Sequence, residues 1–174
     1  MVKIKDATYW AQQIHKGDTT SAELLTLAEK KIEAVNPTYN AVVAYDLKHA
    51  QADLPKTKKG YFAGLPFPLK MLGQDHAGLP STASSKLFKD NIAHPDDHYI
   101  KALLAAGLTP FGQTNAPEFG FKNISDAALY GDTRNVWNSA YYSGGSSGGA
   151  ASAVAAGIFP MAGASDGGGS IRIP

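Results

Sequence analysis

The feature of this sequence that most restricts its fold is a pair of clusters rich in glycine and serine. Residues 144–149 read Gly-Gly-Ser-Ser-Gly-Gly, and residues 166–172 read Asp-Gly-Gly-Gly-Ser-Ile-Arg. Because glycine readily adopts positive φ, such runs can turn successive backbone N–H groups toward one point, as in an oxyanion hole. The segment between them is mostly apolar, which is typical of a packed element and not of a flexible linker. We therefore expect two loops held rigidly on a core, each with serines as candidate nucleophiles.

Length and composition limit the classes of function. The chain has 174 residues, of which 44% are hydrophobic and 18% charged, as in one globular domain. A formal net charge of +1 gives no electrostatic signature of a partner that is nucleic acid or an anionic membrane, so we expect a small-molecule partner. The absence of cysteine excludes disulfides, a thiolate nucleophile and a cysteine-based zinc site, and the sequence indicates no metal or other cofactor.

The hydropathy pattern indicates neither export nor a membrane span. Residues 1–6 are charged from the start and lack the apolar stretch of a signal peptide. The longest weakly polar stretch, residues 150–164, is shorter than the ~20 residues that a membrane helix needs. We therefore expect a cytoplasmic location.

Helical patterns alternate with short apolar runs, which predicts an α/β fold. Gly17 is a plausible helix stop, Thr20 or Ser21 a helix cap, and residues 56–60 a solvated loop. The predicted helices cover residues 7–14, 21–35, 47–54, 96–106 and 149–157, and the predicted strands or apolar runs cover residues 41–45, 65–72, 108–112 and 158–162.

Neither cluster fits a nucleotide-binding loop, because a P-loop needs a lysine after its glycines and no lysine follows Lys122. Residues 144–148 do match the Gly-x-Ser-x-Gly motif of α/β-hydrolases, but that fold needs a histidine downstream of the serine. All five histidines lie upstream: His15, His49, His76, His94 and His98. A histidine base that precedes the serine stays formally open. Each histidine is more simply explained by surface or helix polarity.

Lys70 is the best candidate for the base that activates a serine. It lies in residues 65–72, Leu-Pro-Phe-Pro-Leu-Lys-Met-Leu, where every neighbour is apolar. Desolvation favours the neutral amine and lowers the pKa of a lysine, which can make it a base near neutral pH. From this stretch alone, the alternative is a strand lysine whose ammonium group reaches water along its alkyl stem.

Together these residues resemble the amidase-signature family. Residues 144–151 and 164–174 look like its defining signature, with the two serines 24 positions apart (170 − 146). Residues 64–70, 114–120 and 131–137 are also similar to the family, most of all to the branch of free-standing amidases that includes 6-aminohexanoate cyclic-dimer hydrolase. The resemblance implies an α/β fold with a mixed sheet flanked by helices. Residues 1–174 would be the N-terminal portion of one such domain, truncated just after the nucleophile.

The resemblance also implies an amide hydrolase that works through a covalent acyl-enzyme and needs no cofactor. Ser170 would attack the amide carbonyl, Ser146, in a cis peptide, would relay the proton, and Lys70 would act as the base. Backbone N–H groups of the second cluster would form the oxyanion hole, and nearby side chains would support the site. The implied oxyanion groups are Gly167, Gly168, Gly169 and Ser170, and the supporting residues are Ser147, Asp166 and Arg172.

The sequence departs from the family pattern at some positions, and alternatives stay open. Met71 stands where an aspartate often follows the lysine, and Val136 and Ser143 replace frequent prolines. One alternative is the A subunit of the tRNA-dependent glutamine amidotransferase, whose usual glutamine is replaced here by Ile173. Another is a truncated, non-catalytic remnant. Because the sequence stops four residues after the proposed nucleophile, we expect little amidase activity from this chain alone, and either a homo-oligomer or a partly disordered C-terminus.

Overall fold

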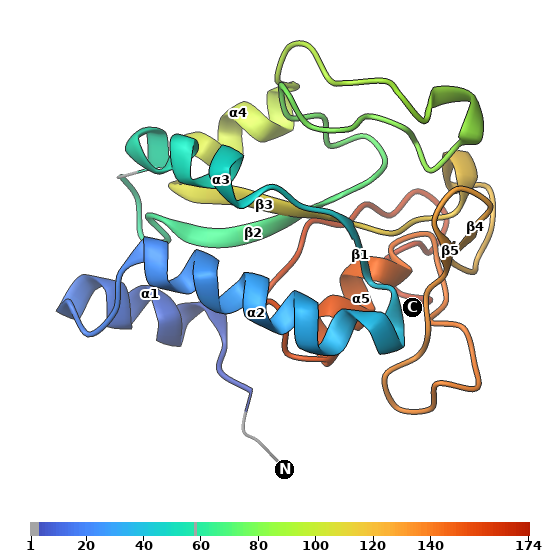
Figure 1. The fold of residues 1–174 in the computed structure, drawn as a ribbon, viewed down its shortest axis with the longest axis horizontal. Helices are drawn as coiled ribbons and strands as arrows, with labels where there is room; N and C mark the ends of the chain where they lie inside the picture. The colour runs from blue at the N-terminus through green and yellow to red at the C-terminus, as the bar shows by residue number, and fades with distance from the viewer. Residues whose placement is uncertain (1–3, 58) are drawn as a thin grey trace.

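The computed structural model describes residues 4–57 and 59–174, so the first three residues of the charged N-terminus and Lys58 of the predicted loop lie outside it. The fold is α/β, as predicted, with helices on both sides of a small mixed sheet (Figure 1). No helix in this described part has the length and apolar character needed to cross a bilayer. The α-helices are α1 (Ala7–Lys16), α2 (Ser21–Tyr39), α3 (Leu47–Asp53), α4 (His98–Ala105) and α5 (Gly148–Ala155), and the strands are β1 (Val42–Ala44), β2 (Leu65–Lys70), β3 (Leu108–Thr114), β4 (Asp126–Ala127) and β5 (Gly131–Asp132).

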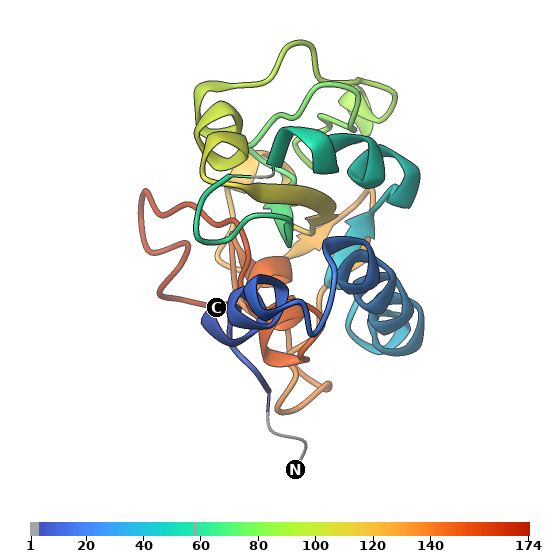
Figure 2. The ribbon, with the colours of Figure 1, turned by 90° about the vertical axis from the view of Figure 1, so that its left-hand side faces the viewer.

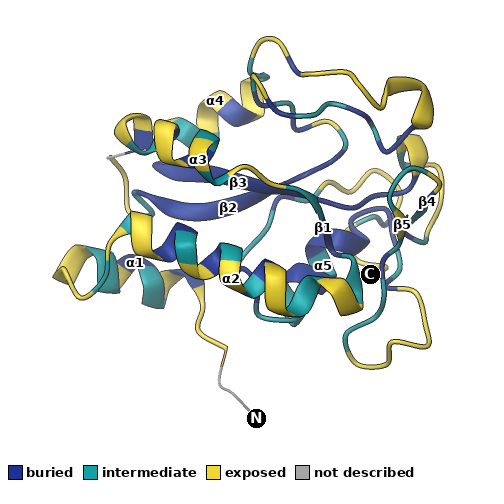
Figure 3. Ribbon diagram, in the orientation of Figure 1, coloured by how far each residue is buried: buried dark blue, intermediate teal, exposed yellow. Residues whose placement is uncertain are grey.

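The central sheet has the strand order β1-β3-β2. β2 and β3 are parallel, whereas β1 pairs antiparallel with β3. All residues of β2 and β3 are buried (Figure 3), as expected for parallel strands that are covered on both faces. Figures 1 and 2 show α1, α2 and α5 below this sheet and α3 and α4 above it. β4 and β5 form a separate two-stranded ladder.

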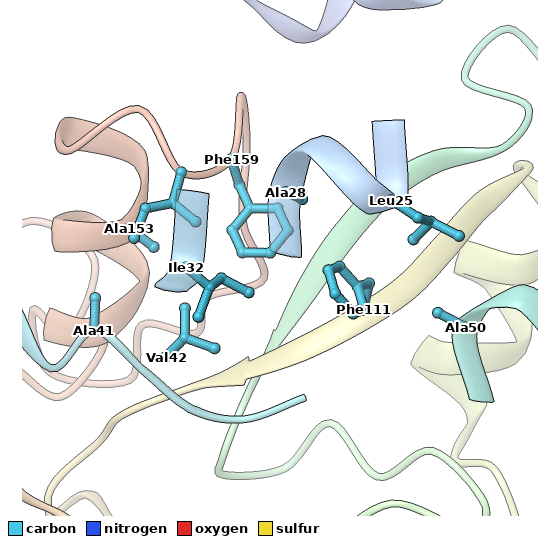
Figure 4. Close-up of a cluster of buried hydrophobic side chains, with 10 residues drawn as sticks. Leu25, Ala28, Ile32, Ala41, Val42, Ala50, Phe111, Ala153 and Phe159 are labelled. Carbon is cyan, nitrogen blue, oxygen red and sulfur yellow. The ribbon is translucent and has the colours of Figure 1, made fainter. Parts of the chain in front are cut away.

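The larger hydrophobic core joins α2 and α5 to the sheet (Figure 4). Leu25 and Ile32 of α2 belong to it together with Phe111 of β3 and Ala153 of α5. The ring of Phe159 lies edge-on to that of Phe111, with their centroids 6.1 Å apart. Because burial of each such large side chain stabilises the fold by about 1.5–3 kcal/mol, this core fixes α5 against the sheet and with it the loop that precedes α5.

The N-terminal helices are bounded by the residues that the sequence suggested. The hydroxyl of Thr20 accepts a hydrogen bond from the amide of Glu23, and the carboxylate of Glu23 accepts one from the amide of Thr20, which makes a capping box. Gly17 ends α1 with φ of 77°. α2 continues beyond the predicted end at residue 35 to Tyr39, because the chain leaves the helical conformation only at Asn40, where φ is 48°.

The strand predicted at residues 158–162 is absent from the described fold. The amides of Ile158 and Phe159 both donate to the carbonyl oxygen of Ala153, so this segment turns back against the end of α5. Pro160 has no N–H group to offer to a neighbouring strand. The apolar composition that suggested a strand therefore reflects packing against the core.

The interpretation of His76 as surface or helix polarity is wrong. Its side chain is only 2% exposed and lies in the loop after β2, with Nε2 2.6 Å from Oδ2 of Asp53 and Nδ1 2.7 Å from Oδ1 of Asp96. Asp96 is available for this contact because α4 begins at His98, two residues later than predicted, with Asp97 as its cap. The three residues come from separate segments, so no local pattern connects them.

Gly149 provides a test of how closely α5 packs on the sheet. A Cβ atom at this position would lie 2.3 Å from the amide nitrogen of Asn115 and 2.6 Å from the carbonyl oxygen of Ala41, both backbone atoms. We expect Gly149→Ala to lower the free energy of unfolding by about 3 kcal/mol or more, since backbone cannot move aside cheaply. Chemical denaturation measures this. Gly168→Ala is the control, because its added Cβ would meet no heavy atom within 4 Å, and an equal loss in both variants would contradict the packing argument.

Candidate active site

Lys70 is the last residue of β2, and its backbone is fixed on both sides. Its amide donates a 2.7 Å hydrogen bond to Oε1 of Gln74, and the amide of the following Met71 donates to the carbonyl oxygen of Thr114 on β3. The hydroxyl of Thr114 in turn donates to the carbonyl oxygen of Leu69. Although Met71 replaces a frequent aspartate, these bonds hold the end of the strand in place.

The side chain of Lys70 is 1% exposed and reaches two serines. Its Nζ lies 2.8 Å from Oγ of Ser146 and 2.9 Å from Oγ of Ser165. Burial lowers the pKa of Lys70 to about 8, partly opposed by the negative charge of Asp166. Among the described residues, no carboxylate oxygen lies within ion-pair distance of this ammonium group. The alternative that the ammonium group reaches bulk water is therefore wrong.

Ser146 lies in the loop directly before α5, and the peptide bond between Gly145 and Ser146 is cis. Both Ser146 and Ser147 are buried. The loop packs closely on the backbone of Ile124, because a Cβ added to Gly145 would lie 2.9 Å from both the carbonyl carbon and the nitrogen of that residue. The first glycine- and serine-rich cluster thus presents the Ser146 hydroxyl to Lys70 in a confined space.

The second cluster is organised around the carboxylate of Asp166. Asp166 accepts hydrogen bonds from the amides of Gly169 at 2.8 Å and Ile171 at 3.0 Å. It also receives a two-point contact from Arg172, with Nη2 at 2.8 Å and Nε at 3.0 Å. These donors, with the Arg172 side chain foremost, hold the pKa of Asp166 well below its usual range. These hydrogen bonds hold the glycine-rich loop around the ionised carboxylate of Asp166.

The two clusters are tied together through Ser147. Its amide donates to the carbonyl oxygen of Ser170 at 3.1 Å, and its hydroxyl donates to the carbonyl oxygen of Ser165 at 3.2 Å. Ser170 itself is partly exposed. The structure therefore brings the loops of Ser146 and Ser170 together beside Lys70.

The glycines expected to form the oxyanion hole are not equivalent. Gly167 and Gly168 are exposed, and an added Cβ at either would meet nothing within 4 Å. The N–H group of Gly169, in contrast, donates to Asp166. The N–H group of Gly169 is therefore already engaged within the chain.

Sequence reasoning assigned no role to two residues of this site. Ser165 contacts the Lys70 ammonium group, and the only signal for it was its position next to Asp166. Gln74 contacts the backbone of Lys70, and a Cβ added to Gly163 would lie 2.1 Å from its Oε1. Gln74 comes four residues after Lys70, yet its side chain gave no local sign of this contact.

Comparison with known proteins identifies the same family that the sequence motifs resemble. Residues 23–174 match the sequence profile of the Amidase family. The chain is 43% identical to lipoamidase from Enterococcus faecalis over 166 residues, which make up 94% of this chain and 23% of that protein. It is 37% identical to 6-aminohexanoate-cyclic-dimer hydrolase from Paenarthrobacter ureafaciens over 172 residues, or 98% of this chain and 35% of that protein. Its fold matches a bacterial aryl acylamidase of the amidase-signature family with a TM-score of 0.90 at 33% identity, covering 99% of this chain and 38% of that chain.

The chain thus spans no more than 38% of the length of these three relatives. The predicted resemblance to amidase-signature enzymes, including the branch with 6-aminohexanoate-cyclic-dimer hydrolase, is confirmed. Because the profile match runs from residue 23 to residue 174, the chain belongs to the amidase family.

Proposed function

We propose that this protein hydrolyses a carbon–nitrogen amide bond of a small molecule, with Ser170 as nucleophile, Ser146 as proton relay and Lys70 as base. The observation that carries the proposal is the buried Nζ of Lys70, 2.8 Å from Oγ of Ser146. With its pKa lowered to about 8, this amine is partly neutral near neutral pH and can accept a proton. Membership of the amidase family supports an amide as the substrate.

In the acylation step, neutral Lys70 accepts the proton of Ser146 while Ser146 accepts that of Ser170. Oγ of Ser170 forms a bond to the amide carbon, and the carbonyl π electrons move to the oxygen. The N–H groups of the glycine loop stabilise this oxyanion. The C–N bond then breaks, the leaving amine takes a proton from Lys70 through Ser146, and an acyl ester remains on Ser170.

In the deacylation step, water attacks the ester carbon and gives up a proton to the same relay. The ester bond breaks, Ser170 regains its proton, and a carboxylic acid leaves. Each cycle consumes one water and one amide and produces one acid and one amine. Ser147, Asp166 and Arg172 hold the loop geometry, and Ser165 orients the Lys70 amine through its hydroxyl.

We also propose that residues 1–174 form the N-terminal portion of a single amidase domain, since the chain accounts for a minor share of each relative's length. The labelling and kinetic tests therefore use a form of this protein that has first been found to hydrolyse a simple amide. A distinct preference of that form for glutamine over other primary amides would favour the amidotransferase alternative. Absence of hydrolysis from a longer, folded form would favour the non-catalytic remnant.

Labelling by a fluorophosphonate probe tests the nucleophile. We expect one probe molecule to attach per chain, because a serine activated by a base attacks the electrophilic phosphorus and releases fluoride. Peptide mass spectrometry should place the added mass on Ser170. The partly exposed Ser81, whose hydroxyl donates to Asp75, is an internal control that should stay unlabelled. Added mass on Ser146 instead of Ser170 would reverse the assigned roles.

A further inference from the structure

A second group of chemistry-bearing side chains lies outside the candidate active site, between α3 and the loop after β2. His49 and Asp53 are four residues apart on α3, and His76 comes from the loop. One ligand atom from each of the three residues lies within 4.8 Å of the other two. Amide hydrolysis as proposed above uses none of these residues.

The three ligand atoms converge on one point. Oδ2 of Asp53 lies 2.6 Å from Nε2 of His76 and 3.7 Å from Nε2 of His49. The two imidazole rings are perpendicular, with centroids 5.1 Å apart. Residues four apart on a helix share one face, so His49 and Asp53 both point at the His76 ring. The longer distance is too great for a hydrogen bond, although it suits two atoms that bind the same ion.

The surroundings of His76 match those of a metal-binding histidine. Its Nδ1 lies 2.7 Å from Oδ1 of Asp96, and this carboxylate oxygen also accepts a 2.7 Å bond from the amide of Ala77. A carboxylate on the far nitrogen fixes the ring orientation and leaves Nε2 for the ion, as in the carboxylate–histidine–zinc arrangement. The second oxygen of Asp53 is held by Nζ of Lys56 at 2.6 Å.

We propose that His49, Asp53 and His76 form a zinc-binding site. Two imidazole nitrogens and one carboxylate oxygen are a ligand set that zinc accepts, whereas calcium and magnesium prefer oxygen ligands alone. Zinc–ligand bonds of about 2.0–2.1 Å require neighbouring ligand atoms to lie roughly 3.3 Å apart. Binding therefore requires the 2.6 Å contact to widen by roughly 0.7 Å and the 3.7 Å contact to shorten by roughly 0.4 Å, through rotation of the side chains. Any proton held between His76 and Asp53 passes to water as the ion enters.

The side chain of His49 is 26% exposed, whereas those of Asp53 and His76 are 3% and 2% exposed. An ion can therefore reach the site from the His49 side, and water completes the coordination. Bound zinc would link α3 to the loop that starts directly after Lys70. The competing arrangement is an ion-pair network without metal, in which Lys56 and a protonated His76 balance Asp53 and Asp96.

Metal titration of the full 174-residue chain distinguishes these arrangements. We expect zinc at about 100 times its dissociation constant to raise the Tm by about 5 °C. Cobalt(II) should give the visible absorption of a four-coordinate ion. His49→Ala should weaken zinc binding at least ~10-fold and remove the cobalt signal. Because His49 is partly exposed, this variant should keep the fold without metal.

His98→Ala is the matched control, since His98 is exposed at the start of α4, and it should bind zinc like the unaltered chain. His76→Gln, which keeps a hydrogen-bonding side chain but loses the ring, should also lose the cobalt signal. The proposal is overturned if zinc leaves the Tm unchanged, or if His49→Ala and the unaltered chain respond alike. No arm depends on amide hydrolysis, so the result is independent of the proposed function.

Discussion

Alanine in place of Ser170 is expected to lower kcat for amide hydrolysis by about 10⁴- to 10⁶-fold. Without the hydroxyl no acyl ester can form, and only substrate binding and the oxyanion donors remain to assist water. The fold should be unaffected, because the contact of Ser170 with Ser147 uses its backbone carbonyl oxygen. Steady-state kinetics on a simple amide, with a thermal melt of the same sample, measures both quantities.

Ser152→Ala is the matched control for this loss. Ser152 is a buried serine of α5 whose hydroxyl donates to the carbonyl oxygen of Arg134. Its removal should cost about 1 kcal/mol of stability and leave kcat within about twofold, as expected for a site without contact to the reacting atoms. If Ser170→Ala keeps more than about a tenth of the activity while Ser146→Ala abolishes it, the nucleophile is Ser146 and the proposed relay is wrong.

The parts of the fold that could be predicted from the sequence depend on neighbouring residues. The capping box of Thr20 and Glu23 and the stop at Gly17 arise from contacts within four residues, and the structure contains both. Such features need no knowledge of what lies across the core.

The environment of Lys70 could be predicted only in part. Its apolar neighbours suggested a desolvated amine, but they fit an ammonium group that reaches water equally well. The structure decides between these because helices cover both faces of the sheet and the strand ends against Ser146 and Ser165. That decision depends on segments 76 and 95 residues further along the chain.

Long-range pairing explains what the sequence did not reveal. Asp53, His76 and Asp96 make a buried network from three segments, and each residue alone resembles an ordinary polar surface residue. The strand expected at residues 158–162 failed for a related reason. Its composition suits a strand, but its amides find their partner at the end of α5. Composition indicates burial, whereas the hydrogen-bond partner determines the element.

Arginine in place of Lys70 is expected to lower kcat by about 10²- to 10⁴-fold, the usual contribution of a general base. A guanidinium group keeps the positive charge but does not deprotonate in the working pH range. A purely electrostatic role would therefore leave much of the activity, whereas a basic role would not. Lys70→Met is the steric control, because methionine has a volume similar to that of lysine. It shows whether a loss of activity in Lys70→Arg comes only from the larger arginine side chain. Kinetics and thermal melts on both variants make the comparison.

The pH dependence of kcat/KM shows in which protonation state Lys70 works. Only the neutral amine of Lys70 accepts a proton, so kcat/KM should rise with pH up to about 8, where burial has placed its pKa, and level off above it. Lys31→Arg is the matched control, because Lys31 is a partly buried lysine whose pKa is also lowered by burial, and its Nζ donates to the carbonyl oxygen of Gly157. This variant should keep both the rate and the rise near pH 8. An active Lys70→Arg enzyme with an unchanged profile would show that the titrating group is not Lys70 and that the serine is activated by another base.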